Sequence, residues 1–453
     1  MTVAVMKTKV EQALSEAFET AAPKLPGGKA VGDARRAAIT RFNSSGLPHR
    51  RVEEWKYTDL RAGLKDALAL SLDDAAKVTI GDLIVALGPL AHVEAHRITF
   101  VNGRLRPELS DLEGADGSGQ TPAGGIEVKP LAGSLMSAPD KVGAGLAATS
   151  GPLDDAVQAL NTAYMTDGAV VRIAANSKPA KPLLIVHVRA GPEARFTAVR
   201  NIISAAEGSE ATILEAHVVL PGAAPDGQIN ALTEVTTGEH ANLTHIKVAV
   251  DNGRTVHLAN WNVGLGANSI YRGFQFTSGQ GLARNQIFAT YKGEGSKLDL
   301  SGAYLARGGE HIDTTLVVDH AVPHCESREL FKGVLDGHAR GVFQGKIIVR
   351  PDAQKTDGKQ MAQALMLSED AEFDSKPELE IYADDVVCGH GTTSAQLDED
   401  LLFYCMSRGI PKAEARALLI ESFIGEAIDK VEHPGIREAL MSYATVWLRS
   451  GIA

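Results

Sequence analysis

The stretch between Pro377 and Gly409 carries the densest set of side chains that could do chemistry. It contains two of the three cysteines, Cys388 and Cys405, and a Cys-Gly-His-Gly run that places His390 two residues after Cys388. In an extended chain, residues two apart lie about 6.5 Å from each other on the same face. A thiolate and a neutral imidazole that share a face are suitable ligands for zinc or iron.

Cys388 and His390 supply only two ligands, whereas a closed structural metal site has about four. The pair therefore predicts an incomplete site that a second chain would complete. The alternative is that Cys388 is a small buried apolar side chain with no ligand role.

A second set of candidate metal ligands lies upstream and comprises His311, Asp313, His320, His324 and Cys325. The period of two along a strand puts His311 and Asp313 on one face and His320 on the other. One strand cannot bring all of them together, and histidines hydrogen-bonded along a β ladder are the alternative. If these ligands did converge, the chain would be a stand-alone metalloenzyme on a β scaffold, which is the rival hypothesis.

Self-contained catalytic motifs are absent from the sequence. It has no GxxxxGK[ST], GxSxG or HExxH run, so it lacks the phosphate-binding loop, nucleophile elbow and zinc-protease signatures. The chain is therefore predicted not to be an enzyme, and any ATP hydrolysis would have to come from a partner.

The middle of the chain has to position these ligands, and its pattern is that of short strands. Between about residues 168 and 396, β-rich runs such as 169–173, 183–188 and 256–263 are separated by glycine-containing turns. The turns recur at intervals of about 30 residues, a period typical of stacked coils. Long helices do not alternate with the strands, which argues against a parallel α/β sheet. A β-helix fits best, and a double-sheet sandwich or jelly roll is the competitor.

Helical patterns flank this core. Residues 1–95 form a predicted N-terminal helical region, with a second helix over Asp33–Asn43 capped by Asp33 and another near Arg61–Leu68. The segment RVEEWKYTDLR at 51–61 is expected to dock by its aromatic side chains on the next domain. The core spans 96–396, with a mixed lead-in to about 165, and residues 397–453 form a C-terminal helical domain.

The C-terminal tail contains a helix over residues 412–431 that has two apolar stripes. One stripe includes Ile420, Ile424 and Ile428, and the other lies about 100° round the helix. A helix packed on one side needs one broad stripe. Two stripes predict burial on two sides, either between the chain and a partner or inside the chain's own domain.

Composition excludes several classes of function. The chain of 453 residues has a net charge of −11 and a pI near 5.7, which argues against a general binder of nucleic acid or anionic membrane. No apolar run reaches about 18 residues, so no membrane-spanning helix is expected. Three cysteines cannot form a disulfide framework, and a reducing cytoplasm is the expected compartment.

Five segments carry a resemblance to a known family when they are taken together. They are RVEEWKYTDLR (51–61), IEVKPLA (126–132), FQGKIIVRPDAQKTDGKQ (343–360), PELEIYADDVVCGHGTTSAQLD (377–398) and LFYCMSRGIPKAEARALLIESFIGEAI (402–428). They resemble the SufB/SufD family, which consists of scaffold subunits of the Suf iron–sulfur cluster assembly machinery. The RVEEWKYTDLR segment and the lack of N-terminal cysteines favour the SufD branch, and the resemblance covers about residues 50 to 430.

The resemblance implies a right-handed parallel β-helix between two helical regions. It implies a non-catalytic scaffold that works with the sister subunit SufB and the ATPase SufC, with a transient iron–sulfur cluster built at the interface with SufB. His390 would be the residue tied to cluster formation, and Cys388 a secondary candidate. The C-terminal helices would dock SufC through residues that include Tyr404, Arg408, Ile420, Ile424 and Ile428. No cofactor is expected on the isolated chain.

One departure from the family pattern follows the ligand. The family reads His-Gly-Ala-Thr followed by Val-Gly or Ile-Gly, whereas here Thr393, Ser394 and Ala395 follow His390-Gly391-Thr392. The ligand is kept, but the backbone after it loses a glycine. The isolated chain is expected to form a homodimer through a free edge or end of the β-helix. The iron and sulfur donors, and any flavin in the complex, are left open by the sequence.

Overall fold

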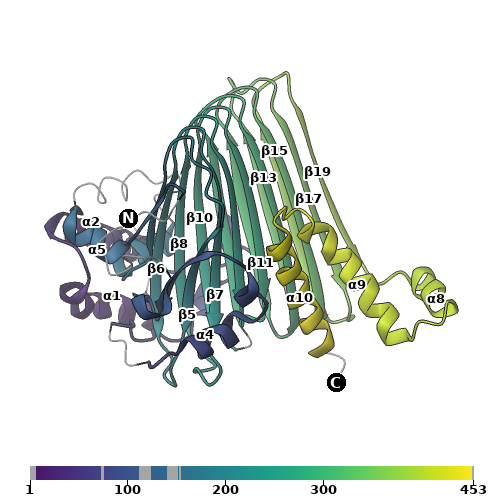
Figure 1. Ribbon diagram of the computed structural model, residues 1–453, viewed down its shortest axis with the longest axis horizontal. Coiled ribbons are helices and arrows are strands. Elements are labelled where there is room, and N and C mark those ends of the chain that lie inside the picture. The colour runs from purple at the N-terminus through teal and green to yellow at the C-terminus, as the bar shows by residue number, and fades with distance from the viewer. Residues whose placement is uncertain are drawn as a thin grey trace.

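In the computed structural model the chain forms a solenoid of two long sheets with helices at both ends (Figure 1). The structure describes residues 7–72, 76–111, 124–139, 152, 155–251 and 253–450. One sheet has ten strands in the order β19-β17-β15-β13-β11-β9-β7-β5-β1-β2, and the other has nine in the order β18-β16-β14-β12-β10-β8-β6-β4-β3. We call them the odd sheet and the even sheet, although β2 belongs to the odd sheet and β3 to the even sheet.

The strands and helices have the following bounds. The strands are β1 (His96–Val101), β2 (Arg104–Leu105), β3 (Ile126–Pro130), β4 (Ala169–Ile173), β5 (Leu183–Arg189), β6 (Phe196–Ala205), β7 (Glu210–Val219), β8 (Gln228–Thr237), β9 (Asn242–Val250), β10 (Val256–Leu265), β11 (Ile270–Ser278), β12 (Leu282–Tyr291), β13 (Lys297–Gly308), β14 (His311–His320), β15 (Glu326–Gly337), β16 (Arg340–Val349), β17 (Asp357–Met366), β18 (Glu372–Ile381) and β19 (Val387–Ala395). The helices are α1 (Lys9–Ala21), η1 (Ala22–Lys24), α2 (Lys29–Ser45), η2 (Glu53–Trp55), α3 (Leu60–Gly63), α4 (Ile80–Leu87), η3 (Gly88–His92), η4 (Pro107–Leu109), α5 (Leu131–Ser137), α7 (Ala156–Tyr164), α8 (Glu399–Ser407), α9 (Lys412–Ile428) and α10 (Pro434–Ser450).

Parallel pairing confirms the predicted solenoid and excludes the sandwich and the jelly roll. From β4 to β19, successive strands alternate between the two sheets, and every strand pair within a sheet is parallel. The register runs without a slip, for example from Val256 of β10 to Leu282 of β12 and on to His311 of β14. Because each coil repeats the position of the one before, equivalent side chains form columns along the lumen and along the outer faces.

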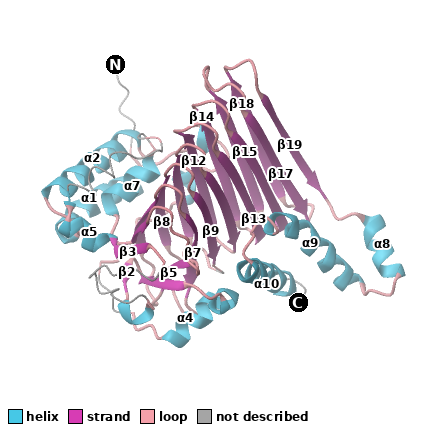
Figure 2. Cartoon of the chain, turned by 45° about the horizontal axis from the view of Figure 1, so that its top comes forward, coloured by secondary structure: helices cyan, strands magenta, loops and turns pink. Residues whose placement is uncertain are grey.

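The two outer faces are covered by different helices. The N-terminal helices α1, α2 and α7 pack on the even sheet through an apolar cluster that includes Phe18, Phe42 and Phe196. The odd sheet is covered by α4, η3, α9 and α10, whose apolar side chains share one core with those of β5 to β15. Figure 2 shows both groups against the solenoid. Since both faces of each sheet are buried over most of its width, many strands are apolar on both sides.

The N-terminal helices differ from the sequence prediction in two details. Helix α2 begins at Lys29 rather than at Asp33, and Asp33 instead pairs with Lys29 and Arg36 on the exposed surface. Only the single turn α3 forms where a helix over Arg61–Leu68 was predicted; Asp59 caps its start, and the chain is extended from Leu64.

The RVEEWKYTDLR segment docks on the even sheet, as predicted. The Trp55 ring is buried and stacks on the Arg284 guanidinium, whose carbon lies 3.8 Å from the ring centroid. Arg284 forms a buried ion pair with Asp313, and the Thr58 hydroxyl donates a hydrogen bond to the same carboxylate. The Arg284 guanidinium also donates to the Glu54 carbonyl. This arrangement satisfies a buried cation and fastens the N-terminal region to the solenoid.

Replacing Trp55 by Ala is expected to lower the free energy of unfolding by about 3–5 kcal/mol, because a large buried ring and its contact with Arg284 are lost together. Urea denaturation followed by circular dichroism measures the change. The matched control is Val52→Ala in the same segment, where the side chain is exposed and the expected change is below about 0.5 kcal/mol. Equal losses in the two variants would contradict this docking role.

Candidate functional site

Cys388 and His390 lie on β19, the last strand of the odd sheet. β19 pairs with β17 on one side only, with Cys388 opposite Gly358 and His390 opposite Gln360. Both side chains belong to the face that continues the lumen, because Gln360 is buried and the Thr392 hydroxyl of β19 lies 3.0 Å from the Ser375 hydroxyl of β18. The strand therefore presents the thiol and the imidazole on one face, as the sequence predicted, and the structure places that face in the last coil of the solenoid.

The two side chains differ in environment. Cys388 is half-buried and packs on the apolar cluster of Ile347, Val349 and Ala383, whereas His390 is exposed. Burial raises the pKa of the Cys388 thiol. A hydrogen bond from the Gly358 backbone lowers this pKa, and the negative charges of the nearby Asp357 and Glu329 raise it. In the isolated chain Cys388 is therefore a thiol, and it must lose its proton before it can bind a metal.

The end of the solenoid that carries this pair is open among the described residues. Every residue of β18 and β19 is half-buried or exposed, and β18 and β19 each form one edge of their sheet. Val387 and Tyr382 are exposed apolar side chains at this end, and a Cβ at Gly389 would meet nothing within 4 Å. An uncovered edge of nine or ten residues is a surface that natural proteins usually protect or pair.

A buried acid lies two strands behind His390. Glu329 of β15 is opposite Gln360 of β17, which is opposite His390, so the three form one lumen column. Glu329 is only 3% exposed, and neither of its carboxyl oxygens has a hydrogen-bond partner among the described residues. Burial raises the pKa of Glu329 to about 8, against opposing effects of Ser327 and Arg328. The carboxyl is therefore protonated through most of the physiological range.

The rival set of ligands does not converge in the described part of the chain. His311 and Asp313 lie on the outer face of β14, where both interact with the Thr58 hydroxyl. His320 points into the lumen, stacks on Tyr291 and bonds to the Ser327 hydroxyl, and His324 is exposed in a turn. His311 and Asp313 therefore share one face of β14 and His320 lies on the other, as the period of two predicts. This arrangement keeps the candidate ligands apart.

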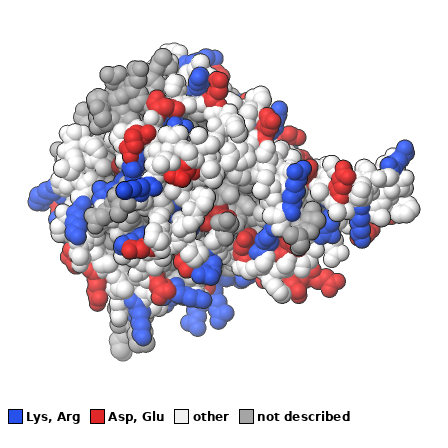
Figure 3. Space-filling model, turned by 60° about the horizontal axis from the view of Figure 1, so that its bottom comes forward, with Lys and Arg blue, Asp and Glu red and all other residues white. Residues whose placement is uncertain are grey.

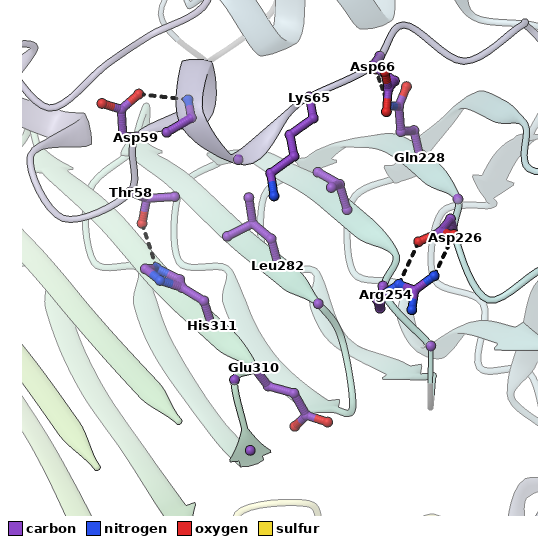
Figure 4. Close-up of a pocket in the computed structure, with 18 of the residues that line it drawn as sticks. Thr58, Asp59, Lys65, Asp66, Asp226, Gln228, Arg254, Leu282, Glu310 and His311 are labelled. Atoms are coloured by element: carbon purple, nitrogen blue, oxygen red, sulfur yellow. Dashed lines mark hydrogen bonds and ion pairs between the residues drawn. The ribbon is translucent and has the colours of Figure 1, made fainter. Parts of the chain in front are cut away.

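A large cleft lies between the N-terminal segment and the even sheet (Figure 4). It has a volume of about 1010 Å³, and its wall includes Lys65, Glu310 and His311. The Arg254 guanidinium pairs with Asp226 at one side, with two N–O distances of 2.9 Å. No cluster of metal ligands is found in this cleft among the described residues.

The predicted docking residues of the tail separate into two groups. Ile420, Ile424 and Ile428 are at most 2% exposed and pack in the core shared with the odd sheet. Their assignment to a partner surface is therefore wrong for the free chain, because the stripe faces the chain's own solenoid. Tyr404 and Arg408 are exposed on α8, where the Arg408 guanidinium donates to the Tyr404 hydroxyl at 3.1 Å.

Helix α8 also carries, beside the predicted Tyr404, three apolar side chains that sequence reasoning did not single out. Leu401, Phe403, Tyr404 and Met406 are exposed, with Phe403 at 71%, and we call them the α8 patch. The helix projects from the body of the protein, at the right of Figure 1 and Figure 3. On the face in Figure 3, basic and acidic side chains are interspersed. None of the helices in the described residues is long and apolar enough to cross a membrane.

Comparison with known proteins gives two family matches. The SufBD core domain of the SUF system for FeS cluster assembly matches residues 187–423, and the N-terminal region of SufBD proteins matches residues 9–185. The iron–sulfur cluster assembly protein SufD of Escherichia coli is 32% identical over 406 residues, covering 88% of each chain. A SufBD-family protein of Synechocystis is 30% identical over 446 residues, covering 95% of this chain and 94% of the relative. SufD of Bacillus subtilis is 29% identical over 289 residues, covering 63% and 65% respectively.

The raised pKa of Glu329 predicts that the free energy of unfolding depends on pH. The folded pKa of Glu329 is raised from 4.5 to about 8, so its contribution to stability is full below about pH 4.5 and is lost as the pH rises to about 8. The loss is expected to be a few kcal/mol, with a slope of at most about 1.4 kcal/mol per pH unit. Glu329→Gln should remove this slope in urea titrations at pH 5 to 8.

The matched control for this titration is Glu326→Gln. Glu326 lies on the same strand but pairs with Lys297 near the surface. It should keep the wild-type slope. A Glu329→Gln variant whose stability falls with pH as steeply as the wild type would contradict the assignment.

Proposed function

The chain belongs to the SufBD family of iron–sulfur cluster assembly proteins and is of the SufD type; from this premise we propose that it is a non-catalytic scaffold subunit in the cytoplasm. Its partners are the sister scaffold SufB, on which the open solenoid end docks, and the ATPase SufC, which binds the tail. The cluster is cargo that is built at the joint between the two scaffolds and is then released.

The observation that carries the proposal is the position of Cys388 and His390 at an unprotected solenoid end. β19 and β18 expose unpaired backbone edges of nine and ten residues, and a second solenoid can extend both sheets by adding strands in the same way as the preceding coils. Such a joint would cover the exposed side chains of Val387 and Tyr382. It would also enclose the two ligands and leave them to be completed by ligands from the partner.

The chemistry of the two ligands suits this role. His390 offers an imidazole that binds iron when neutral, and mixed histidine and cysteine coordination occurs in iron–sulfur clusters. Cys388 has a raised pKa, so it stays a protonated, weakly nucleophilic thiol until iron or a partner cation stabilises the thiolate. Two ligands bind a cluster weakly, which favours transfer over storage. The same open end would let the isolated chain pair with a second copy of itself.

The α8 patch is the proposed contact for SufC. Its apolar side chains are exposed on a helix whose only buried residue is Leu402, and exposed aromatic side chains of this kind are typical anchors of protein interfaces. Tyr404 and Arg408 add a polar contact at its edge. ATP binding by the partner would then move α8, and through it the β18–β19 end, which lies next to it in the sequence.

Replacing His390 by Ala is expected to reduce cluster assembly on the SufB–SufC–SufD complex at least tenfold, because a ligand is removed from an exposed position that does not support the fold. Assembly is followed by the visible absorption of the cluster, and complex formation is measured separately by size exclusion. Ser394→Ala is the matched control, since Ser394 is exposed on the same strand and the same face. Normal cluster assembly by the His390 variant in an intact complex would contradict the role of His390 as a ligand.

Replacing Phe403 by Ser together with Tyr404→Ala is expected to weaken SufC binding at least tenfold, as measured by calorimetry, because aromatic anchors dominate interface energies. The stability of the chain should not change, since both side chains are exposed. Val446→Ala on α10, which removes another exposed apolar side chain of the tail, is the control and should bind normally. Equal affinity in all three chains would refute a contact at the α8 patch.

A further inference from the structure

A cluster of ligand-bearing side chains is enclosed in the lumen near the start of the solenoid. His187 on β5 lies opposite His217 on β7, and Glu215 precedes His217 by two residues on the same strand. One potential ligand atom from each of these three residues lies within 4.8 Å of the others. All three side chains are buried. Of the described residues, these are the only group of three or more that could hold a metal ion by this spacing.

The imidazoles of this cluster have nitrogen atoms without partners. His187 Nδ1 and His217 Nδ1 are buried and make no hydrogen bond in the described structure. His257, which reaches across the lumen from β10, has no partner on either ring nitrogen and is 1% exposed. Its ring centroid lies 4.9 Å from that of His217. Buried polar atoms are normally satisfied, so four nitrogen atoms left bare in one place indicate a missing ligand.

The charge of the cluster also suits a cation. Burial alone would raise the pKa of Glu215, but hydrogen bonds from His217 and His245 hold it well below its ordinary value, so the group is a carboxylate. Thr233 Oγ1 donates to its second oxygen at 2.8 Å. Burial and the neighbouring His217 lower the pKa of His187 to about 3, and burial and the neighbouring Lys247 lower that of His257 well below 6.5. Both rings are therefore neutral and keep a free lone pair.

We propose that His187, Glu215 and His217 bind one divalent transition-metal ion inside the solenoid, next to the unpartnered ring of His257. Nitrogen-rich donor sets with one carboxylate select zinc or iron(II) over calcium and magnesium, which prefer oxygen ligands. An ion bound at His217 Nε2 displaces the proton that this atom shares with Glu215 at 2.6 Å, and that proton moves to the bare Nδ1 of the same neutral ring, so binding needs no net loss of a proton. Thr233 and Asn201, which contact Glu215 and His187, orient the ligands from outside.

This site is separate from the one at the open end. β7 and β19 are six strand steps apart in the odd sheet, which corresponds to about 29 Å at 4.8 Å per step. The inference therefore does not depend on the role proposed for Cys388 and His390. Because the lumen encloses the ligands, the ion has to enter as the chain folds, and its binding energy stabilises the first coils of the solenoid.

The test uses the full-length chain produced in cells whose medium contains Co²⁺ as the probe, followed by dialysis against a chelator. The expected result is one Co²⁺ per chain with visible absorption, and a coordination shell of nitrogen and oxygen without sulfur by X-ray absorption. Glu215→Gln and His217→Gln should retain at least tenfold less metal. His320→Gln is the matched control, because His320 is also a buried lumen histidine with a bare ring nitrogen. A chain with Cys388→Ser and His390→Ala should bind as the wild type does.

Three results would overturn the proposal. They are a chain without bound metal, full retention by the Glu215 and His217 variants, and sulfur in the shell or loss of metal in the Cys388/His390 variant. If the lumen variants do not fold, the coordination shell of the wild-type protein decides, since two or three imidazoles with a carboxylate can come from this cluster alone among the described residues. Elemental analysis of chain grown without added cobalt then shows whether zinc or iron occupies the site in cells.

Discussion

The parallel register of the two sheets is the constraint on which the rest of the structure depends. Each coil satisfies the backbone donors and acceptors of the coil before it, so the stack is self-consistent except at its two ends. At the first end, the short antiparallel strands β2 and β3 close the sheets. At the last end, β18 and β19 have no following coil among the described residues. The ligands of the proposed assembly site lie at the end where the register is left unfinished.

In the lumen, hydrogen-bond donors decide more than burial does whether an enclosed carboxyl group is ionised. Glu215 and Glu329 are both almost fully buried. Glu215 accepts hydrogen bonds from His217 and Thr233, and its pKa is held well below the ordinary value. Glu329 has no such donors, and its pKa rises to about 8. The same strand fold therefore holds an anion in one coil, which attracts a cation, and a neutral acid in another, which stores a proton.

Local features were predictable from the sequence, whereas features that depend on register were not. The strand Ala169–Ile173 and the Cys388/His390 pair follow from a period of two within one segment, and the structure has both. Strand β8 shows no clear alternation, because buried polar side chains such as Asn230, which donates to the Val157 carbonyl of α7, lie under the covering helix. The cluster of His187, Glu215 and His217 needs strands about 30 residues apart to align. No single window of sequence carries that information.

The tail shows why a pattern of burial does not identify the partner. The stripe of α9 that contains Ile420, Ile424 and Ile428 is buried against the chain's own odd sheet, whereas Leu419 and Phe423 of the other stripe are only half-buried. Detaching the three isoleucines would cost about 5–9 kcal/mol, more than a partner could readily supply for a movement in each cycle. A partner that binds α8 would therefore leave α9 in place and rotate α8 about the exposed link between Ser407 and Lys412, where Gly409 has a φ of +87°. The movement would reach the open end through residues 396–398, which join β19 to α8, and not through the helices that cover the odd sheet.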